Sequence, residues 1–254
     1  MKTMLKAAML GTALSVTALC GGTAFADDAA APAPAISFTG NIAISTDYMF
    51  RGVSQSGNSP SVSGGFDASA GMFYAGTWAA SINFAPMEWD VYAGLKPTTG
   101  PVSWDIGAIG YIYPDSHVPS GGADLNYMEG YIKPSIVPIK NTTLGLAFYA
   151  SPDFFAETGA AYYGELNGSL ALTPALSLSG AAGYQDVEDL NGPLPGTKSG
   201  NYWTWNAGAT YTIAGFGLDL RYVDTSVSAA KPISGFTGIE ATKARVVFSI
   251  KRAM

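Results

Sequence analysis

The connections between the predicted strands alternate between long and short along most of the sequence. Segments in which polar and apolar residues alternate have the period of a β-strand, because successive side chains point to opposite faces. Connections after even-numbered segments are short, as at 71–73 and 213–215, whereas most of those after odd-numbered segments are long and polar, as at 49–61 and 186–201. This alternation is typical of an antiparallel up-and-down barrel that crosses a membrane with an even number of strands, so both termini are expected in the periplasm. The predicted strands, about 12 in number, are 37–48, 62–70, 74–84, 88–96, 102–113, 127–136, 142–150, 156–171, 175–185, 202–212, 216–225 and 241–250.

The third predicted strand, 74–84, illustrates the two faces. One face carries Tyr74, Trp78 and Phe84, and the other carries small or polar residues such as Ala75 and Thr77. We interpret the first face as lipid-facing and the second as lining a wet interior. The alternative is a secreted β-sandwich, which would bury one face of each strand in a core of branched aliphatic residues. Both faces are instead rich in Gly, Ala and Ser, which favours the membrane barrel.

The N-terminal residues have the pattern of a secretory signal peptide. A lysine-containing start leads into a short apolar run, and Ala-Phe-Ala at 24–26 is a small-x-small cleavage site. We therefore expect a signal peptide over 1–26, a periplasmic linker over 27–36 and an outer-membrane barrel over 37–254. Cleavage removes the only cysteine, which excludes disulfides in the mature chain. It also lowers Lys+Arg from 13 to 11 against 19 Asp+Glu, a formal charge of −8 that disfavours nucleic acid as a partner.

Aromatic residues gather near the predicted strand ends, as girdles at the headgroup levels of a bilayer do. The alternative is that strands are simply rich in aromatic residues. The inner girdle is predicted from Phe73, Tyr74, Tyr211 and Phe216. The outer girdle is predicted from Tyr48, Phe50, Phe84, Tyr111, Tyr113, Tyr127, Phe154, Phe155, Tyr184, Tyr202 and Trp203.

Charged residues on the predicted strands fall mostly on the face opposite the large apolar residues. Charge on the lipid face of a barrel is destabilising, so these side chains are expected to point inward. Two interpretations remain open: the charges line a water-filled lumen, or they pair with one another and seal a narrow barrel. The candidate lumen-lining residues are Asp47, Arg51, Asp67, Asp90, Asp105, Asp219, Arg221, Lys243 and Arg245.

Signals for an enzyme or a cofactor site are weak. The single histidine, His117, lies in Pro-Asp-Ser-His at 114–117, where adjacent residues do not readily form a catalytic relay. The acidic residues Asp186, Glu188 and Asp189 have no regular spacing, and we interpret them as a solvated cluster rather than a calcium site. We expect no cofactor, no metal and no enzymatic activity.

Several stretches resemble a known family. They are STDYMFRGVSQSGNSPSVSGGFD at 45–67, GMFYAGTWAASINF at 71–84, EWDVYAGLKP at 88–97, YMEGYIKPSI at 127–136 and SPDFFAETGAAYYGEL at 151–166. With them the sequence resembles the TorF-family porins, a conserved hypothetical outer-membrane protein family. The resemblance implies a Gram-negative outer-membrane barrel assigned as a porin, and it supplies no catalytic residues. Such barrels commonly finish on an aromatic residue that the assembly machinery reads, whereas this chain ends on Met254 with Phe248 as the nearest candidate.

Two functions remain open at this point. The first is a porin-like channel for the passive diffusion of small hydrophilic solutes or ions. The second is a closed outer-membrane barrel that acts as an adhesin, a receptor or a lipid-active enzyme. The expected partners are outer-membrane lipid, the outer-membrane assembly machinery and small solutes or ions, and a homo-oligomer stays open.

Overall fold

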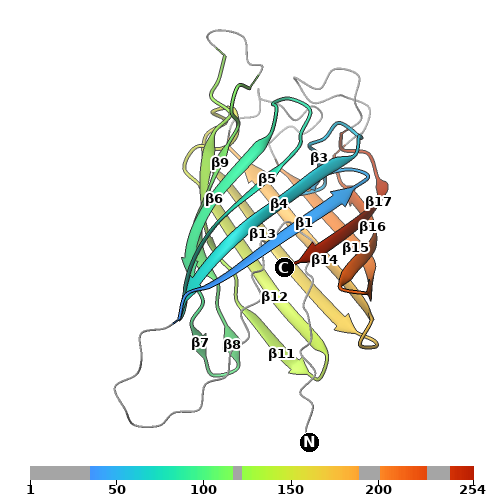
Figure 1. The fold of residues 1–254 in the computed structure, drawn as a ribbon. Coiled ribbons are helices and arrows are strands. Elements are labelled where there is room, and N and C mark those ends of the chain that lie inside the picture. The colour runs from blue at the N-terminus through green and yellow to red at the C-terminus, as the bar shows by residue number, and fades with distance from the viewer. Residues whose placement is uncertain (1–34, 117–121, 189–200, 228–240) are drawn as a thin grey trace, which may run out of the picture.

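The computed structural model describes residues 35–116, 122–188, 201–227 and 241–254. The predicted signal peptide, all but two residues of the predicted linker, His117 and Asp189 lie outside these described residues. No helix in the described part of the chain is long and apolar enough to cross a membrane. The described residues form a closed antiparallel barrel, which confirms the predicted fold class (Figure 1).

Twelve strand positions make up the wall, and some are interrupted. The long wall strands are β1 (Ser37–Ser45), β4 (Ser61–Ala70), β5 (Phe73–Ala80), β6 (Glu88–Leu95), β9 (Ile106–Ile112), β10 (Tyr127–Ile132), β12 (Thr142–Ser151), β13 (Ala161–Ala171), β14 (Leu176–Val187), β15 (Tyr202–Ile213), β16 (Phe216–Thr225) and β17 (Arg245–Ala253). The short strands β7 (Thr98–Thr99), β8 (Val102–Ser103) and β11 (Ser135–Ile139) extend the wall beyond β6, β9 and β10. Two further short strands, β2 (Met49–Phe50) and β3 (Val53–Ser54), pair only with each other.

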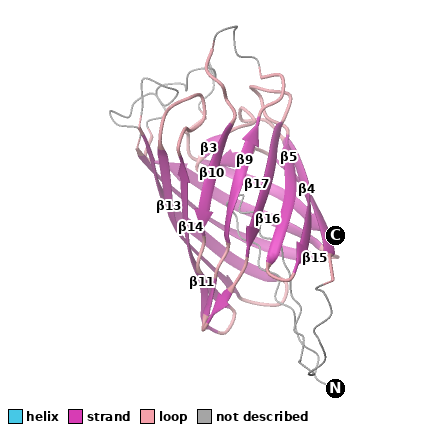
Figure 2. Ribbon diagram, turned by 90° about the vertical axis from the view of Figure 1, so that its left-hand side faces the viewer, coloured by secondary structure: helices cyan, strands magenta, loops and turns pink. Residues whose placement is uncertain are grey.

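Every wall strand pairs with its neighbours in sequence, and the barrel closes where β1 pairs with β17. Tight turns collect at one end, which we call the short-turn end, and the longer connections collect at the other, the long-loop end (Figures 1 and 2). The observed arrangement matches the predicted alternation of connection lengths. Two predicted starts are wrong, because β13 begins at Ala161 rather than 156 and β17 begins at Arg245 rather than 241. Before β13, Ala156 and Glu157 adopt left-handed conformations, with φ of 62° and 56°, that interrupt the extended chain.

The outer surface of the barrel is apolar. Along each strand, large exposed apolar residues alternate with buried or polar ones, as Phe66 (70% exposed) alternates with the buried Asp67 on β4. Leu220 and Tyr222 on β16 are likewise exposed, while Arg221 between them is buried. In a single-layer barrel the buried set must face the interior, so the exposed set forms the lipid-facing surface of a transmembrane barrel.

The face of β5 that we predicted to meet lipid instead points inward. Tyr74 and Trp78 are buried, whereas Phe73 is exposed on the opposite face. Strand parity separates the two faces but does not say which one is inside. The Tyr74 hydroxyl donates to Asp105 (2.5 Å), and a partner of this kind is found inside the barrel rather than in lipid.

The predicted aromatic girdles need the same correction. Five members of the predicted outer girdle are buried in the barrel instead of facing the headgroups: Tyr48, Tyr111, Tyr113, Tyr127 and Tyr202. Trp203 is exposed as predicted, and so are Phe73, Tyr211 and Phe216 of the inner girdle. Most of the tyrosines therefore lie in the interior, where the hydroxyls of Tyr48, Tyr92 and Tyr113, for example, donate hydrogen bonds to carboxylates.

The interior has two unlike sides. The first, which we call the aromatic wall, consists of large inward side chains on β5, β6, β9, β10, β12 and β13: Tyr74, Trp78, Tyr92, Ile109, Tyr111, Tyr127, Tyr131, Tyr149 and Tyr163. The second, the polar arc, consists of small or polar inward side chains on β13–β17 and β1: Asn41, Ala43, Ser45, Asn167, Ser169, Ser179, Ala181, Asn206 and Ser249. Members of the polar arc are only half-buried although they face inward, so water reaches them inside the barrel.

Candidate functional site

A hairpin from the first long connection folds into the barrel. Strands β2 and β3 flank Arg51 and Gly52, whose φ angles of 46° and 82° fit the tight type I′ turn of a two-residue hairpin. We call this segment, from Tyr48 to Ser56, the inserted hairpin. Its tip presses against the wall, because a Cβ on Gly52 would lie 2.2 Å from Cγ2 of Thr225. The lumen is therefore crossed by a segment of the chain itself.

The base of the inserted hairpin is fixed by Asp47. This carboxylate accepts hydrogen bonds from Ser54 Oγ (2.7 Å) and Ser56 Oγ (2.8 Å). Arg245 at the start of β17 donates to the same carboxylate at 2.5 Å. The backbone of Ser54 also donates to the carbonyl of Ala241 (2.8 Å). These bonds hold the hairpin against the strand that closes the barrel.

Arg51, at the tip, reaches the opposite side of the interior. Its guanidinium forms a two-pronged pair with Glu129 on β10, with N–O distances of 2.9 and 2.7 Å, and donates to Oε1 of Gln185 on β14 at 2.8 Å. The side chain is 6% exposed and that of Glu129 is 1% exposed. A paired, hydrogen-bonded charge is the form in which a charge tolerates burial.

Four rings surround the same guanidinium. Its central carbon lies 4.3 Å from the ring centre of Tyr163, 4.7 Å from Phe50, 5.0 Å from Tyr149 and 6.0 Å from Phe154. A cation held against aromatic faces gains attraction from the ring quadrupoles, more so where water is excluded. Arg51 is thus the best-anchored part of the inserted hairpin.

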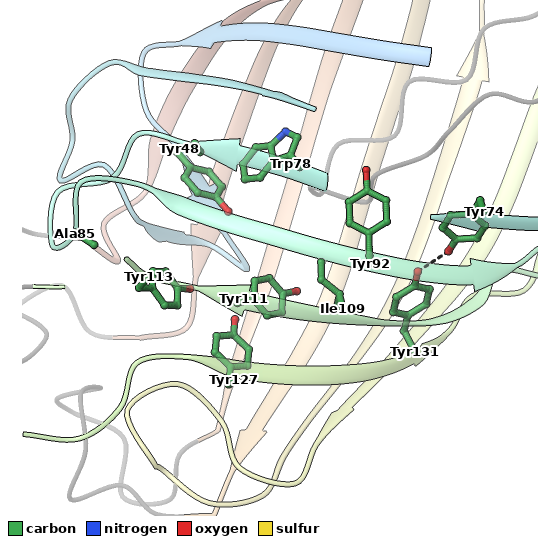
Figure 3. Packing of buried hydrophobic residues seen from close by; sticks show 11 residues of the cluster. Tyr48, Tyr74, Trp78, Ala85, Tyr92, Ile109, Tyr111, Tyr113, Tyr127 and Tyr131 are labelled. Atoms are coloured by element: carbon green, nitrogen blue, oxygen red, sulfur yellow. Dashed lines mark hydrogen bonds between the residues drawn. The ribbon is translucent and has the colours of Figure 1, made fainter. Parts of the chain in front are cut away.

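Carboxylates on the aromatic wall are held by tyrosine hydroxyls. Figure 3 shows the rings of this wall gathered along neighbouring strands. The pairs, with their distances, are Tyr48 with Glu88 (2.5 Å), Tyr113 with Glu88 (2.9 Å), Tyr92 with Asp67 (2.7 Å), Tyr74 with Asp105 (2.5 Å), Tyr111 with Glu129 (3.1 Å) and Tyr163 with Glu165 (2.8 Å). A neutral donor satisfies an acceptor oxygen without supplying a positive charge, so Asp67, Glu88 and Glu165 have no cationic partner among the described residues.

Asp90 has the least satisfied carboxylate of the wall. It is 2% exposed, and its Oδ1 has no hydrogen-bond partner among the described residues. Its direct neighbours across the sheet are Trp78 on β5 and Tyr111 on β9, and Glu88 precedes it by two residues on the same face. A buried carboxylate in this position attracts a proton, a water molecule or a cation.

The polar arc carries one charged network, around Arg221 on β16. Its guanidinium contacts Asp219 (3.2 Å), Asn206 Oδ1 (2.7 Å) and Ser179 Oγ (2.8 Å). Asp219 also accepts from Thr210 Oγ1 at 2.6 Å. The network joins β14, β15 and β16 through their inward side chains, so it places a guanidinium on the polar arc.

The nine predicted lumen-lining residues do not form one cluster. Asp67 and Asp90 lie on the aromatic wall, Asp219 and Arg221 lie on the polar arc, and Asp47, Arg51 and Arg245 hold the inserted hairpin. Asp105, between β8 and β9, pairs with Lys133 at 3.1 Å. Lys243 is exposed in the turn before β17, so strand parity does not apply to it.

Sequence reasoning missed several charged or polar residues of the interior, namely Glu88, Glu129, Lys133, Glu165 and Gln185. Parity would have found Glu88, because it precedes the predicted inward residue Asp90 by two residues. No group of three or more His, Cys, Asp or Glu residues in the described ranges is arranged to hold a metal ion. The interior offers paired charges, tyrosine hydroxyls and small polar groups, which together suit water, ions and small polar molecules.

Three solved structures that are similar to this chain over most of its length are porins. The KdgM porin has a TM-score of 0.56 and 8% identity, covering 84% of this chain and 98% of that chain. The NanC porin has a TM-score of 0.54 and 7% identity, covering 85% and 98%. A KdgM porin in complex with disordered oligogalacturonate has a TM-score of 0.53 and 9% identity, covering 85% and 98%. At such identities the likeness shows the fold alone.

The sequence itself gives a more specific assignment. No curated protein matches it. These comparisons do not confirm the TorF name that the resembling stretches suggested. They do confirm that the chain belongs to a conserved family without an assigned function. Since the family described as "Bacterial protein of unknown function (Gcw_chp)" matches residues 29–254, the chain belongs to that family.

Proposed function

We propose that this protein is a narrow, non-enzymatic channel in the bacterial outer membrane, through which small hydrophilic solutes or ions diffuse. The observation that carries the proposal is the polar arc, whose small inward side chains remain half-buried inside a closed barrel. Barrels of eight strands are filled by their own side chains, and those of sixteen leave an aqueous channel. A twelve-stranded barrel lined on one side by Gly, Ala, Ser and Asn leaves room for water along that side.

The channel prefers cations weakly. Four inward carboxylates, Asp67, Glu88, Asp90 and Glu165, form no ion pair with any described residue. On the polar arc Arg221 is paired with Asp219, whereas Lys251 on β17 faces the unpaired carboxylates, so the field runs across the lumen rather than along it. Such a field orients dipolar solutes and selects only modestly by charge.

Reversal potentials in a salt gradient across a planar bilayer test both statements. Refolded protein should give a small conductance with cation preference, and Asp90→Asn and Asp105→Asn should each reduce that preference. Asp224→Asn is the matched control, because Asp224 lies on β16 at the parity of the exposed Tyr222, outside the lumen. Unchanged selectivity in Asp90→Asn would contradict the assignment of that carboxylate to the conduction path.

A closed barrel that serves as an adhesin, a receptor or a lipid-active enzyme is the second candidate. The inserted hairpin favours it, because the hairpin crosses the interior and contacts both Glu129 on β10 and the wall at Thr204 and Thr225 on β15 and β16. A heat-modifiable, correctly folded barrel that conducts no ions would support this candidate and refute the channel.

A further inference from the structure

The wall residues around Arg51 are arranged independently of Arg51. Gln185 donates from Nε2 to the carbonyls of Tyr162 (3.2 Å) and Asp186 (3.1 Å), which turns its Oε1 into the barrel. Glu129 is held by the hydroxyl of Tyr111, and the Tyr163 ring is held by its own hydroxyl bond to Glu165. The acceptors and ring faces are therefore preset by β10, β13 and β14 rather than by the hairpin.

These wall residues have the composition of a receptor for a planar organic cation. Glu129 offers two carboxylate oxygens to a two-pronged donor, and Gln185 offers a third acceptor. Tyr149 and Tyr163 offer ring faces within 5.0 Å of the bound carbon. A guanidinium, which is planar, weakly hydrated and rich in donors, matches this set better than a metal ion or an alkylammonium does.

Arg51 reaches these wall residues only by adopting an unfavourable backbone conformation. Arg51 has a φ of 46°, a left-handed conformation that type I′ turns normally give to Asn, Asp or Gly. A simple tight turn would not require an arginine at this position. The arginine is explained by what its side chain reaches, since Glu129 lies 78 residues away and Gln185 lies 134 residues away in the sequence.

We propose that Glu129, Gln185, Tyr149 and Tyr163 form a binding site for guanidinium-bearing solutes, which Arg51 occupies as a tethered ligand. We call this set the guanidinium cage. A solute with a guanidinium group competes with Arg51 for the cage and releases the tip of the inserted hairpin. The role of the cage in transport rests on the channel proposed above, whereas binding to the cage does not.

Chemical rescue of Arg51→Ala tests the cage by binding alone. The refolded variant, checked for heat-modifiable gel mobility, is titrated calorimetrically with guanidinium chloride against a sodium chloride blank. Urea, a neutral molecule of similar shape, is the ligand control. We expect saturable guanidinium binding that is at least roughly tenfold tighter than in the wild type, because the paired carboxylate and the rings both favour the ion. Urea should not bind.

Two further variants test whether the guanidinium binds at the wall residues that Arg51 contacts. Arg51→Ala combined with Glu129→Gln should lose the binding, because the carboxylate that pairs with the ion is gone. Arg252→Ala removes an exposed arginine that also stacks on a ring, Phe216 at 4.7 Å, and should bind no more guanidinium than the wild type. Equal binding by Arg51→Ala and the wild type would overturn the proposal, and so would undiminished binding by the double variant.

Conductance separates the cage from the channel. Arg51→Ala should conduct more than the wild type, and millimolar guanidinium, but not urea, should lower its conductance. If the refolded barrel conducts no ions, the channel is refuted while the calorimetric result still decides the cage. If the barrel conducts and guanidinium neither binds nor blocks, the cage is refuted while the channel stands.

Discussion

Replacing Gly52 with alanine should release the inserted hairpin while leaving the barrel intact. The new Cβ would lie 2.2 Å from Cγ2 of Thr225 and 2.6 Å from Oγ1 of Thr204, closer than packed atoms approach. The backbone φ of 82° is also unfavourable for any residue with a Cβ. Strain of about 1–2 kcal/mol and overpacking of about 1–3 kcal/mol add to about 2–5 kcal/mol. This lowers the population of the docked hairpin relative to the undocked one by about 30-fold to several thousand-fold.

Trypsin provides an assay that does not depend on conduction. Arg51 is buried in the docked hairpin, so its peptide bond should resist cleavage in the wild type. In Gly52→Ala the undocked tip should be cut after Arg51, as mass spectrometry of the fragments would show, and bilayer conductance should rise. Wall hydrogen bonds do not involve Gly52, so heat-modifiable mobility should be unchanged.

Gly100→Ala is the matched control. Gly100 also has a left-handed φ, 59°, but a Cβ there meets nothing within 4 Å. It therefore carries the backbone strain without the clash, at the short-turn end of the barrel. Trypsin resistance of Arg51 in Gly52→Ala equal to that in Gly100→Ala would refute the conclusion that the hairpin tip is packed against β15 and β16.

Three further predictions concern the barrel. Arg221→Ala leaves Asp219 buried without its cation and should lower the free energy of unfolding by about 3 kcal/mol in urea titrations followed by gel mobility. Arg252→Ala, at an exposed position near the end of β17, should change it by less than about 1 kcal/mol, and similar losses in the two variants would contradict the burial of the Asp219–Arg221 pair. Leu220→Arg on the lipid face should cost about 2–4 kcal/mol in lipid vesicles, and retention of full stability there would place β16 in the opposite orientation. An epitope inserted after Asp115 at the long-loop end should be detected on intact cells, and one inserted after Gly100 only once the outer membrane is opened; the reverse pattern would invert the orientation of the barrel.

The strand framework follows from the sequence because it depends on local patterns. Period-two alternation and turn residues lie within each hairpin, so β14, β15 and β16 were predicted within two residues at each end. Which face of each strand points into the barrel was harder to predict. Tyr74 and Trp78 look lipid-facing by hydrophobicity, and only their partners, such as Asp105 on another strand, place them inside. Parity gives two faces, and long-range contacts decide between them.

The inserted hairpin was beyond the reach of local patterns. The segment 49–61 reads as a long polar loop, and its inward course depends on Glu129, Gln185, Thr204 and Thr225, which lie on four different strands. No sequence rule brings residues from such distant positions together. The Arg-Gly pair between two apolar residues was the one local sign of a tight hairpin turn.

Closure of the wall by β1 and β17 has a consequence for how the chain folds. All other neighbours around the barrel are consecutive in sequence, but Asn41 pairs with Ala253. Consecutive hairpins form quickly because their loops are short, whereas this last pairing must wait until the far end of the chain arrives. Until then the free edges of β1 and β17 are open to pairing with other chains. Folding kinetics should therefore show the final seam as the slow step, and the waiting intermediate as the species most prone to aggregate.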